Sequence, residues 1–167
     1  MELKEPLSVI AEDCGLTAAL EAMGERWSFM ILRAAFNRIY HFEEFQSKLG
    51  IARNILANRL ARLVDHGILM RQPLVEDRRK IEYRLTEKGM ALLPAMIALR
   101  QWGEKWGSGV PSTRVLVDKA DHQPIKPVSI RAHDDRILGA MDLCWRHAAE
   151  IEPLGAARQA EVTEEAA

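Results

Sequence analysis

The sequence predicts a mainly α-helical fold with one small β-hairpin, an α+β arrangement. Apolar residues recur at helical spacing in successive segments between residues 15 and 64. Directly after Gly67 the pattern changes to the alternation of strands, in "ILMRQPL" and then "KIEYRL". Before this hairpin a short helix, a tight turn and a longer helix follow one another. That order is the layout of a winged helix-turn-helix.

Length and composition allow one hydrophobic core with an appendage. The chain has 167 residues, of which 48% are apolar and 28% charged, as in soluble globular proteins. We expect an N-terminal arm at 1–13, a winged-helix domain for DNA binding and dimerisation at 14–106, and a C-terminal extension at 107–154 that forms a hairpin and a short helix. The tail at 155–167 has the composition of a disordered segment.

The chain carries no pattern for a membrane or for secretion. Its apolar runs are shorter than the roughly 20 residues of a membrane span, and "MELKEPLS" lacks the apolar centre of a signal peptide. We therefore expect a cytoplasmic protein without a membrane partner. Cys14 and Cys144 are far apart in the sequence and are expected to be free thiols.

The first helical region is divided by one glycine. In "GLTAALEAMGERWSFMILRAAF" Gly24 interrupts the apolar spacing, which predicts two short helices joined at "GER". The next segment, "RIYHFEEFQSKLG", places Phe42, Phe45 and Leu49 on one face. Gly50 is a natural C-terminal stop for that helix.

The helix "ARNILANRLARLVDHG" is the second helix of the predicted helix-turn-helix. Its inward positions are Leu56, Leu60, Leu63 and Val64. Its outward positions are Arg53, Asn54, Ala57, Asn58, Ala61 and Arg62. Arg pairs with guanine edges, Asn pairs with adenine edges, and Ala allows close approach of the backbone, so this face is a candidate reader of bases. An ordinary solvated face is the alternative.

The predicted hairpin has a basic tip in the most basic part of the chain. From Asn37 to Gly89 there are eleven Lys or Arg against seven Asp or Glu, whereas both flanks are acidic. Arg78, Arg79 and Lys80 lie at the tip, where a wing meets phosphates, and the neighbouring Glu76 and Asp77 offset part of their charge.

The segment from Thr86 to Trp106 predicts a helix with more apolar surface than one winged helix covers. Thr86 is placed to cap it, and Pro94 predicts a kink or a shifted start. We expect this terminal helix to pair with the first helices of a second chain about a two-fold axis. The alternative is that the C-terminal extension covers it. The expected interface residues are Leu92, Met96, Leu99, Trp102 and Trp106.

In the extension, "TRVLVDK" and "PIKPVSIRAH" alternate like strands around the turn-rich "ADHQP". The next run, "ILGAMDLCWRHAAEI", has helical spacing. Because His122, His133, Cys144 and His147 lack tight ligand spacing, we predict neither a metal site nor a cofactor.

From Cys14 to Trp106 the chain resembles the HxlR-type winged-helix transcription regulators, which are MarR-like. The resemblance lies in an ordered set of motifs: a Cys before the first helix, "G.RW", "L..RL..L...G" and "Y.LTEKG". It implies a dimeric DNA-binding regulator that often responds to a metabolite or an electrophile, and we expect a repressor. Ala52 departs from the family, which commonly has a hydroxyl residue there; its loss costs about 1 kcal/mol of capping.

The resemblance implies double-stranded promoter DNA and a second copy of the chain as partners, with a small molecule or an electrophile as effector. We expect no enzyme, because nucleophile–base spacing, a Gly-rich phosphate loop and an HExxH helix are all missing from the sequence. The alternative function is a winged-helix protein-interaction module, in which Arg78, Arg79 and Lys80 contact an acidic partner.

Cys14 precedes the first helix, where a helix N-terminus favours thiolate while Glu12 and Asp13 disfavour it. Its position matches the Cys that some HxlR-like regulators use to sense oxidants or electrophiles. A buried, inert cysteine is the alternative. A small aromatic ligand among Trp27, Trp102 and Trp106 is a third hypothesis.

Overall fold

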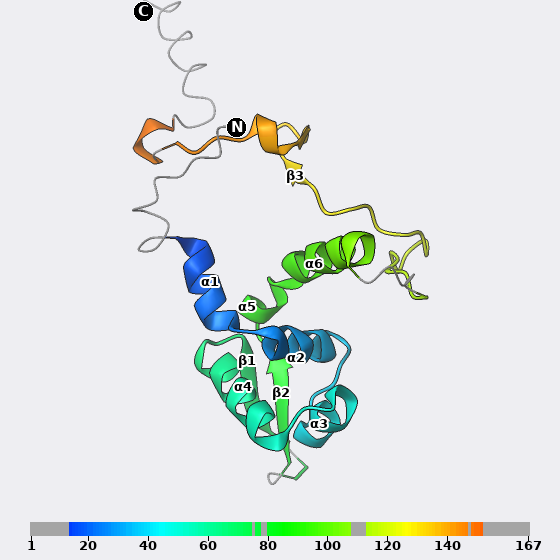
Figure 1. Cartoon of the computed structure of the whole chain (residues 1–167). Coiled ribbons are helices and arrows are strands. Elements are labelled where there is room, and N and C mark those ends of the chain that lie inside the picture. Colours follow the sequence, from blue (N-terminus) through cyan, green and yellow to red (C-terminus); the bar gives the residue numbers. More distant parts are fainter. Residues whose placement is uncertain (1–13, 75, 78–79, 108–112, 147, 152–167) are drawn as a thin grey trace, which may run out of the picture. The chain divides into compact units, whose positions relative to one another are not determined.

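The computed structural model describes residues 14–74, 76–77, 80–107, 113–146 and 148–151 (Figure 1). The described residues fall into two compact units, one within 14–128 and one within 129–151. The first unit therefore takes in part of the expected extension. Within the described ranges, none of the helices has the length and hydropathy needed to cross a bilayer.

The first helical region forms two helices, as its interrupted spacing predicts. Helix α1 (Gly15–Met23) ends at Gly24, whose φ of 68° is easily reached only by glycine, and α2 (Arg26–Phe36) follows. Helix α2 buries Ile31 and Leu32 fully. It is therefore the central helix of the core.

The helix-turn-helix consists of α3 (Phe42–Leu49) and α4 (Arg53–Asp65). Gly50 ends α3 in the left-handed conformation, with φ 62°, and its N–H donates to the carbonyl oxygen of Gln46 at 3.0 Å. Ala52 is the N-cap of α4 and supplies no side-chain hydrogen bond. The short turn between the two helices thus depends on Gly50 rather than on a capping side chain.

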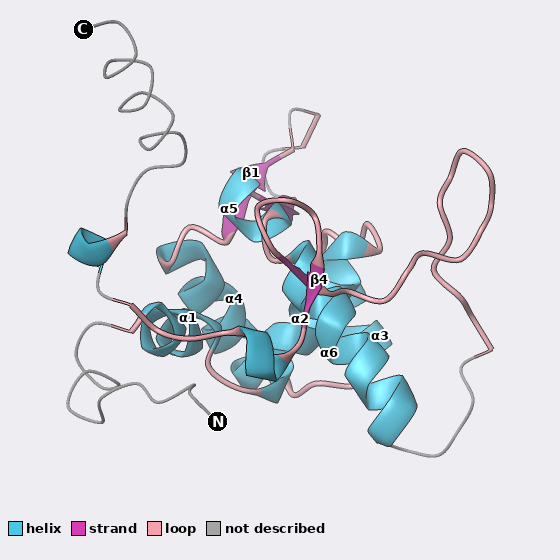
Figure 2. Cartoon of the chain, turned by 90° about the horizontal axis from the view of Figure 1, so that it is seen from above, coloured by secondary structure: helices cyan, strands magenta, loops and turns pink. Residues whose placement is uncertain are grey.

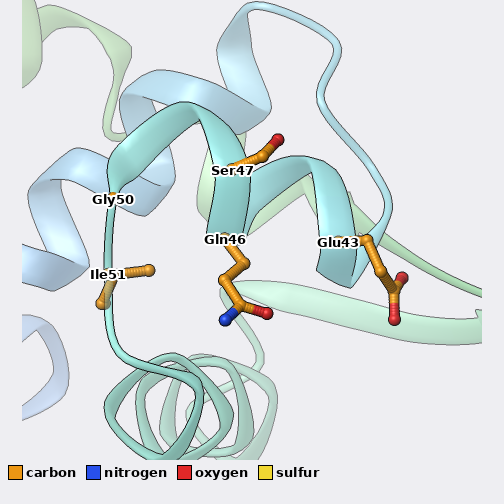
Figure 3. Close-up of a pocket in the computed structure, with 5 residues that line it drawn as sticks. All are labelled: Glu43, Gln46, Ser47, Gly50 and Ile51. Atoms are coloured by element: carbon orange, nitrogen blue, oxygen red, sulfur yellow. The ribbon is translucent and has the colours of Figure 1, made fainter.

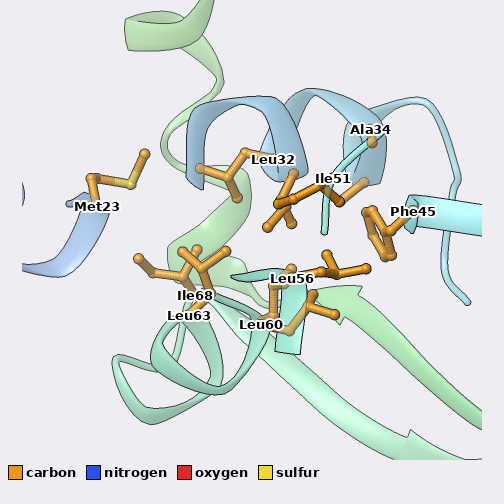
Figure 4. Close-up of a cluster of buried hydrophobic side chains, with 12 residues drawn as sticks. Met23, Leu32, Ala34, Phe45, Ile51, Leu56, Leu60, Leu63 and Ile68 are labelled. Atoms are coloured by element: carbon orange, nitrogen blue, oxygen red, sulfur yellow. The ribbon is translucent and has the colours of Figure 1, made fainter. Parts of the chain in front are cut away.

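The core of the first unit lies where α2, α3, α4 and the start of the hairpin converge (Figure 4). Phe45 of α3 and Leu56, Leu60 and Leu63 of α4 are all 0% exposed. Burying a side chain of this size contributes roughly 1.5–3 kcal/mol. The inward face of α4 is therefore fixed by packing, and its opposite face is left to solvent.

The wing is an antiparallel hairpin of β1 (Leu69–Pro73) and β2 (Ile81–Leu85), with Arg71 opposite Tyr83. The segment before α3 joins its edge: His41 bridges Glu82, and Tyr83 N–H donates to the Tyr40 carbonyl oxygen at 2.8 Å. The hairpin is therefore attached directly to the entry of the helix-turn-helix. In Figure 1 it lies beside α3 and α4.

The long segment after the wing forms two helices, α5 (Glu87–Met90) and α6 (Leu93–Trp106). Thr86 caps α5 as predicted, its Oγ1 accepting from Gly89 N–H at 3.1 Å. Pro94 stands in the first turn of α6, so the interruption expected there is a new helix start, where proline removes no hydrogen bond.

Residues 113–128 form a looped hairpin that is attached to α6. Val117 bridges Pro124, close to the predicted turn. The Gln101 side-chain amide donates to the Lys126 carbonyl oxygen at 3.3 Å and accepts from Val128 N–H at 2.8 Å. One helical side chain thus holds the end of this hairpin as a neighbouring strand would.

The described part of the second unit contains β3 (Ile130–Arg131) paired with β4 (Ile137–Leu138) and two 3-10 turns, η1 (Ala140–Asp142) and η2 (Ala148–Glu150). The helix predicted over 137–151 is therefore wrong. Figure 2 draws this part as loops with the short strand β4 and short helical turns. Met141 and Trp145 remain 77% and 59% exposed, so the described residues offer these side chains no packing surface that would stabilise a helix.

Candidate nucleic-acid interface

The first turns of α4 present the predicted polar face to solvent. Arg53, Asn54, Ala57 and Asn58 are all exposed, while the leucines on the other side of the helix are buried. Together they offer one cation, two side-chain amides and one small residue. Such a face can make paired hydrogen bonds to base edges.

Arg62 differs from its expected outward position. It is half-buried, and its Nη2 donates to the backbone carbonyl oxygen of Glu21 in α1. One turn earlier, Arg59 pairs with the carboxylate of Glu25. The flank of α4 that carries Arg59 and Arg62 faces the α1–α2 junction, because residues three apart lie on one side of a helix.

The wing supplies a second basic element. Lys80 is exposed directly before β2, and its backbone N–H donates to the Asp77 carbonyl oxygen at 2.9 Å. Arg78 and Arg79 lie outside the described residues. The predicted wing cations are thus represented by Lys80 alone in the part of the hairpin that the structure describes.

A hollow of about 550 Å³ lies between the wing and the helix-turn-helix. Arg53 and Lys80, which are distant in sequence, both line it, so two predicted site residues meet here. The Arg53 guanidinium also lies over the ring of Phe42, with Cζ 4.7 Å from the ring centroid. The lining residues are His41, Phe42, Glu43, Arg53, Lys80, Ile81 and Tyr83.

A second hollow, of about 440 Å³, lies along α3 and the turn that follows it (Figure 3). Glu43, Gln46 and Ser47 line it together with Gly50 and Ile51. The first helix of a helix-turn-helix crosses the DNA backbone, so Gln46 and Ser47 are candidate phosphate contacts that the sequence analysis missed. The signal for them in the sequence is their place on α3 directly after Phe45, whose side chain is buried.

A polar cluster joins the wing to the segment before α3. Glu82 is only 6% exposed and accepts from Nε of Arg84 at 2.6 Å, while Nε2 of His41 lies 3.7 Å from its other oxygen. The hydrogen bond from Arg84 holds the pKa of Glu82 below its usual range. Burial acts in the opposite direction and has the smaller effect. Arg84 in turn lies over the ring of Tyr40, 4.4 Å from its centroid.

The predicted interface residues of α6 divide into two groups. Leu99, Trp102 and Trp106 are 53%, 63% and 66% exposed, whereas Leu92 and Met96 pack partly against the core of their own chain. The exposed group gathers on the second half of the helix.

Cys14 is the half-buried N-cap of α1, and Cys144 is exposed in the other unit. Both are free thiols. Where side chains are described, no group of three His, Cys, Asp or Glu is placed to hold a metal ion.

Comparison with known proteins gives consistent matches. The family of the HxlR-like helix-turn-helix matches residues 22–110, more than half of the chain. An uncharacterised HTH-type transcriptional regulator of Mycobacterium tuberculosis is 44% identical over 88 residues, which are 53% of this chain and 56% of that protein. The chain thus spans about half the length of this relative.

Two solved structures are similar as well. PA1607, provisionally described as a transcription factor, is 39% identical with a TM-score of 0.77, over 84% of this chain and 99% of that one. The redox regulator HypR in its oxidised form is 27% identical with a TM-score of 0.50, over 55% and 96% of the two chains. These likenesses agree with the winged-helix architecture. The chain belongs to the HxlR-like helix-turn-helix family.

Proposed function

We propose that this protein is a sequence-specific DNA-binding transcriptional regulator, a repressor that acts as a homodimer. The observation that carries the proposal is the exposed face of Arg53, Asn54, Ala57 and Asn58 on α4, opposite a fully buried leucine face. In this proposal α4 enters the major groove, whose donors and acceptors these side chains match. The buried leucines fix which side of α4 is exposed, so this face can meet DNA without a rearrangement of the fold.

The wing and α3 provide the contacts to the DNA backbone. Lys80 shares a hollow with Arg53, and Arg78 and Arg79 stand next to it in the sequence. Phosphate contacts fix the position of a protein on the duplex, and base contacts provide selectivity. The names of the relatives, which are transcriptional regulators, support the same function.

The homodimer is supported by the apolar end of α6. Leu99, Trp102 and Trp106 form an exposed apolar group of the kind that marks a protein interface. A two-fold axis through this helix would place two copies of α4 about 34 Å apart, one turn of DNA. Palindromic half-sites at that spacing are the expected operator.

Regulation through Cys14 is the finer part of the proposal. Its thiol stands at the N-terminus of α1, close in sequence to the exposed Leu16 and Leu20. HypR, a similar structure, is a redox regulator by name. Oxidation of Cys14 would displace α1, to which Arg62 of α4 is attached, and so alter the presentation of the DNA-facing helix.

The test is selection of a duplex from a random pool with the purified chain, followed by affinity measurements on the selected and scrambled duplexes. Asn54→Ala should reduce the preference for the selected duplex by roughly 1–3 kcal/mol if its contact is bidentate. Asn37→Ala, a matched change at an exposed asparagine outside α4, should not reduce it.

Two results would contradict the proposal. An unaltered preference in Asn54→Ala would remove α4 from the base contacts. A chain that enriches no duplex would instead be a winged-helix protein-interaction module.

A further inference from the structure

We propose that Phe42 is a positioning residue for DNA recognition, because its ring holds the Arg53 guanidinium ready at the start of α4. The inference rests on the proposed function and adds a role that the polarity of α4 does not suggest. Phe42 and Arg53 are the first residues of α3 and α4, and the turn between these helices brings them together. Cζ of Arg53 lies 4.7 Å from the centre of the ring.

The platform itself is held in place. Phe42 is half-buried and packs against the hydrophobic core, while Arg53 is exposed. The ring therefore has a fixed position, and the guanidinium rests on it from the solvent side. A long side chain that is already ordered loses less rotamer freedom when a ligand binds it.

The contact with the ring also leaves the donors of Arg53 available. A ring attracts the face of a guanidinium, so the N–H groups at its edge remain free for guanine or for phosphate. Among the described residues, Arg53 forms no ion pair, unlike Arg59 and Arg84, which pair with Glu25 and Glu82.

A second contact between an arginine and an aromatic ring, in the same unit, differs because its arginine is paired within the protein. Arg84 lies 4.4 Å from the ring centre of Tyr40, but its Nε donates to Glu82 at 2.6 Å. That arginine is used within the protein. Arg53 lines the open hollow that it shares with Lys80, where a ligand can reach it.

The experiment measures affinity for the selected duplex at one salt concentration with Phe42→Leu, Phe42→Tyr, Arg53→Ala and the double variant Phe42→Leu with Arg53→Ala. Phe42→Tyr keeps the ring and should bind as the wild type does. Phe42→Leu keeps apolar volume but loses the ring, and should weaken binding about two- to five-fold, as expected for an exposed cation–π contact. In the Arg53→Ala background it should have no further effect.

Tyr40→Leu is the matched control, since it removes the ring under Arg84 and should leave the Arg53-dependent part of the affinity unchanged. An equal loss from Phe42→Leu with and without Arg53 would overturn the inference, because the ring would then act through the fold. If Arg53→Ala itself binds normally, the role of Arg53 in the proposed function fails instead.

A measurement on the wild type covers the case in which Phe42→Leu does not fold. The NMR signal of the Arg53 side-chain Nε–H should show a ring-current shift and restricted motion in the free protein. An order parameter below roughly 0.6, the range of flexible groups, would overturn the inference.

Discussion

Arg62 on α4 donates a hydrogen bond from its Nη2 to the backbone carbonyl oxygen of Glu21 on α1. Three residues earlier, Arg59 pairs with Glu25 in the turn between α1 and α2. One flank of α4, the helix that carries the predicted DNA-contacting residues, is therefore attached to the N-terminal helices. This attachment gives the two faces of α4 separate roles, which mutations can distinguish.

Arg62→Ala should lower the free energy of unfolding by about 1–2 kcal/mol, because it removes a hydrogen bond from a charged donor. Urea denaturation measures the loss. The preference between selected and scrambled duplexes should stay as in the wild type, in contrast to Asn54→Ala. A large change in selectivity without a change in stability would return Arg62 to the base-reading face. Arg33→Ala, at an exposed site on α2, is the control for removing a positive charge.

Stability should decrease in acid because of Glu82. The hydrogen bond from Arg84 lowers the pKa of Glu82 in the folded state below its ordinary 4.5. A lowered folded pKa means that this stabilisation is complete above the unfolded value and is lost as the pH falls through the folded one. Thermal unfolding between pH 7 and pH 3 should therefore show a drop below about pH 4.5 that Glu82→Gln reduces.

Asp134→Asn is the control for the acid effect. The pKa of Asp134 is also lowered, by a hydrogen bond from Arg136, but this pair lies in the other unit. It should leave the unfolding of the winged helix unchanged. A pH profile that Glu82→Gln does not alter would show that the cluster around His41 contributes nothing to acid sensitivity.

Gly89 should tolerate no side chain. A Cβ at this position would lie 2.2 Å from the backbone oxygen of Ile68. Gly89→Ala should therefore cost about 1–3 kcal/mol of stability through overpacking. Gly103→Ala on α6, where a Cβ meets nothing within 4 Å, should add about 0.5–1 kcal/mol through helix propensity. A destabilised Gly103→Ala would show that a second copy approaches α6 closely at this glycine.

The oligomeric state should depend on the exposed end of α6. Trp102→Glu places a charge in the apolar group with Leu99 and Trp106, and should convert a dimer into single chains. Light scattering after gel filtration measures the mass. Trp145→Glu changes a similarly exposed tryptophan of the other unit and should leave the dimer intact. A mass that is the same in Trp102→Glu and wild type would place the interface elsewhere.

The response to oxidants should depend on one thiol. Diamide, which takes two electrons and two protons from a pair of thiols, should join the Cys14 thiols of the two copies as a disulfide and release wild-type protein from the selected duplex. Cys14→Ser should stay bound, and Cys144→Ser should behave as the wild type. Cys14 has no side-chain hydrogen bond to cap α1, so serine should leave the fold undisturbed. If the wild-type complex survives at diamide concentrations that modify Cys14, as judged by mass spectrometry, thiol sensing is excluded and a reversible ligand is the effector to seek.

The sequence alone determined the order of the elements, because the signals for them are local. Helical spacing, Gly24, Gly50 and the cap at Thr86 each act within a few residues, and the structure confirms the helices and the hairpin that they predict. The same reasoning failed over 137–151, where the apolar side chains at helical spacing stay exposed in the part of the chain that the structure describes. Helical spacing predicts an apolar face, but the helix is stable only where that face packs on another element.

Only the tertiary structure decided which side chains meet. Arg53 lies on Phe42, Arg62 reaches Glu21, and both contacts depend on how helices cross rather than on spacing within one helix. On α4 alone, Arg53 and Arg62 are alike: cations beside a polar face. The fold gives one of them an aromatic ring and open solvent, and gives the other a backbone carbonyl oxygen of α1, because the packing of α1 and α3 against α4 determines where each side chain can go.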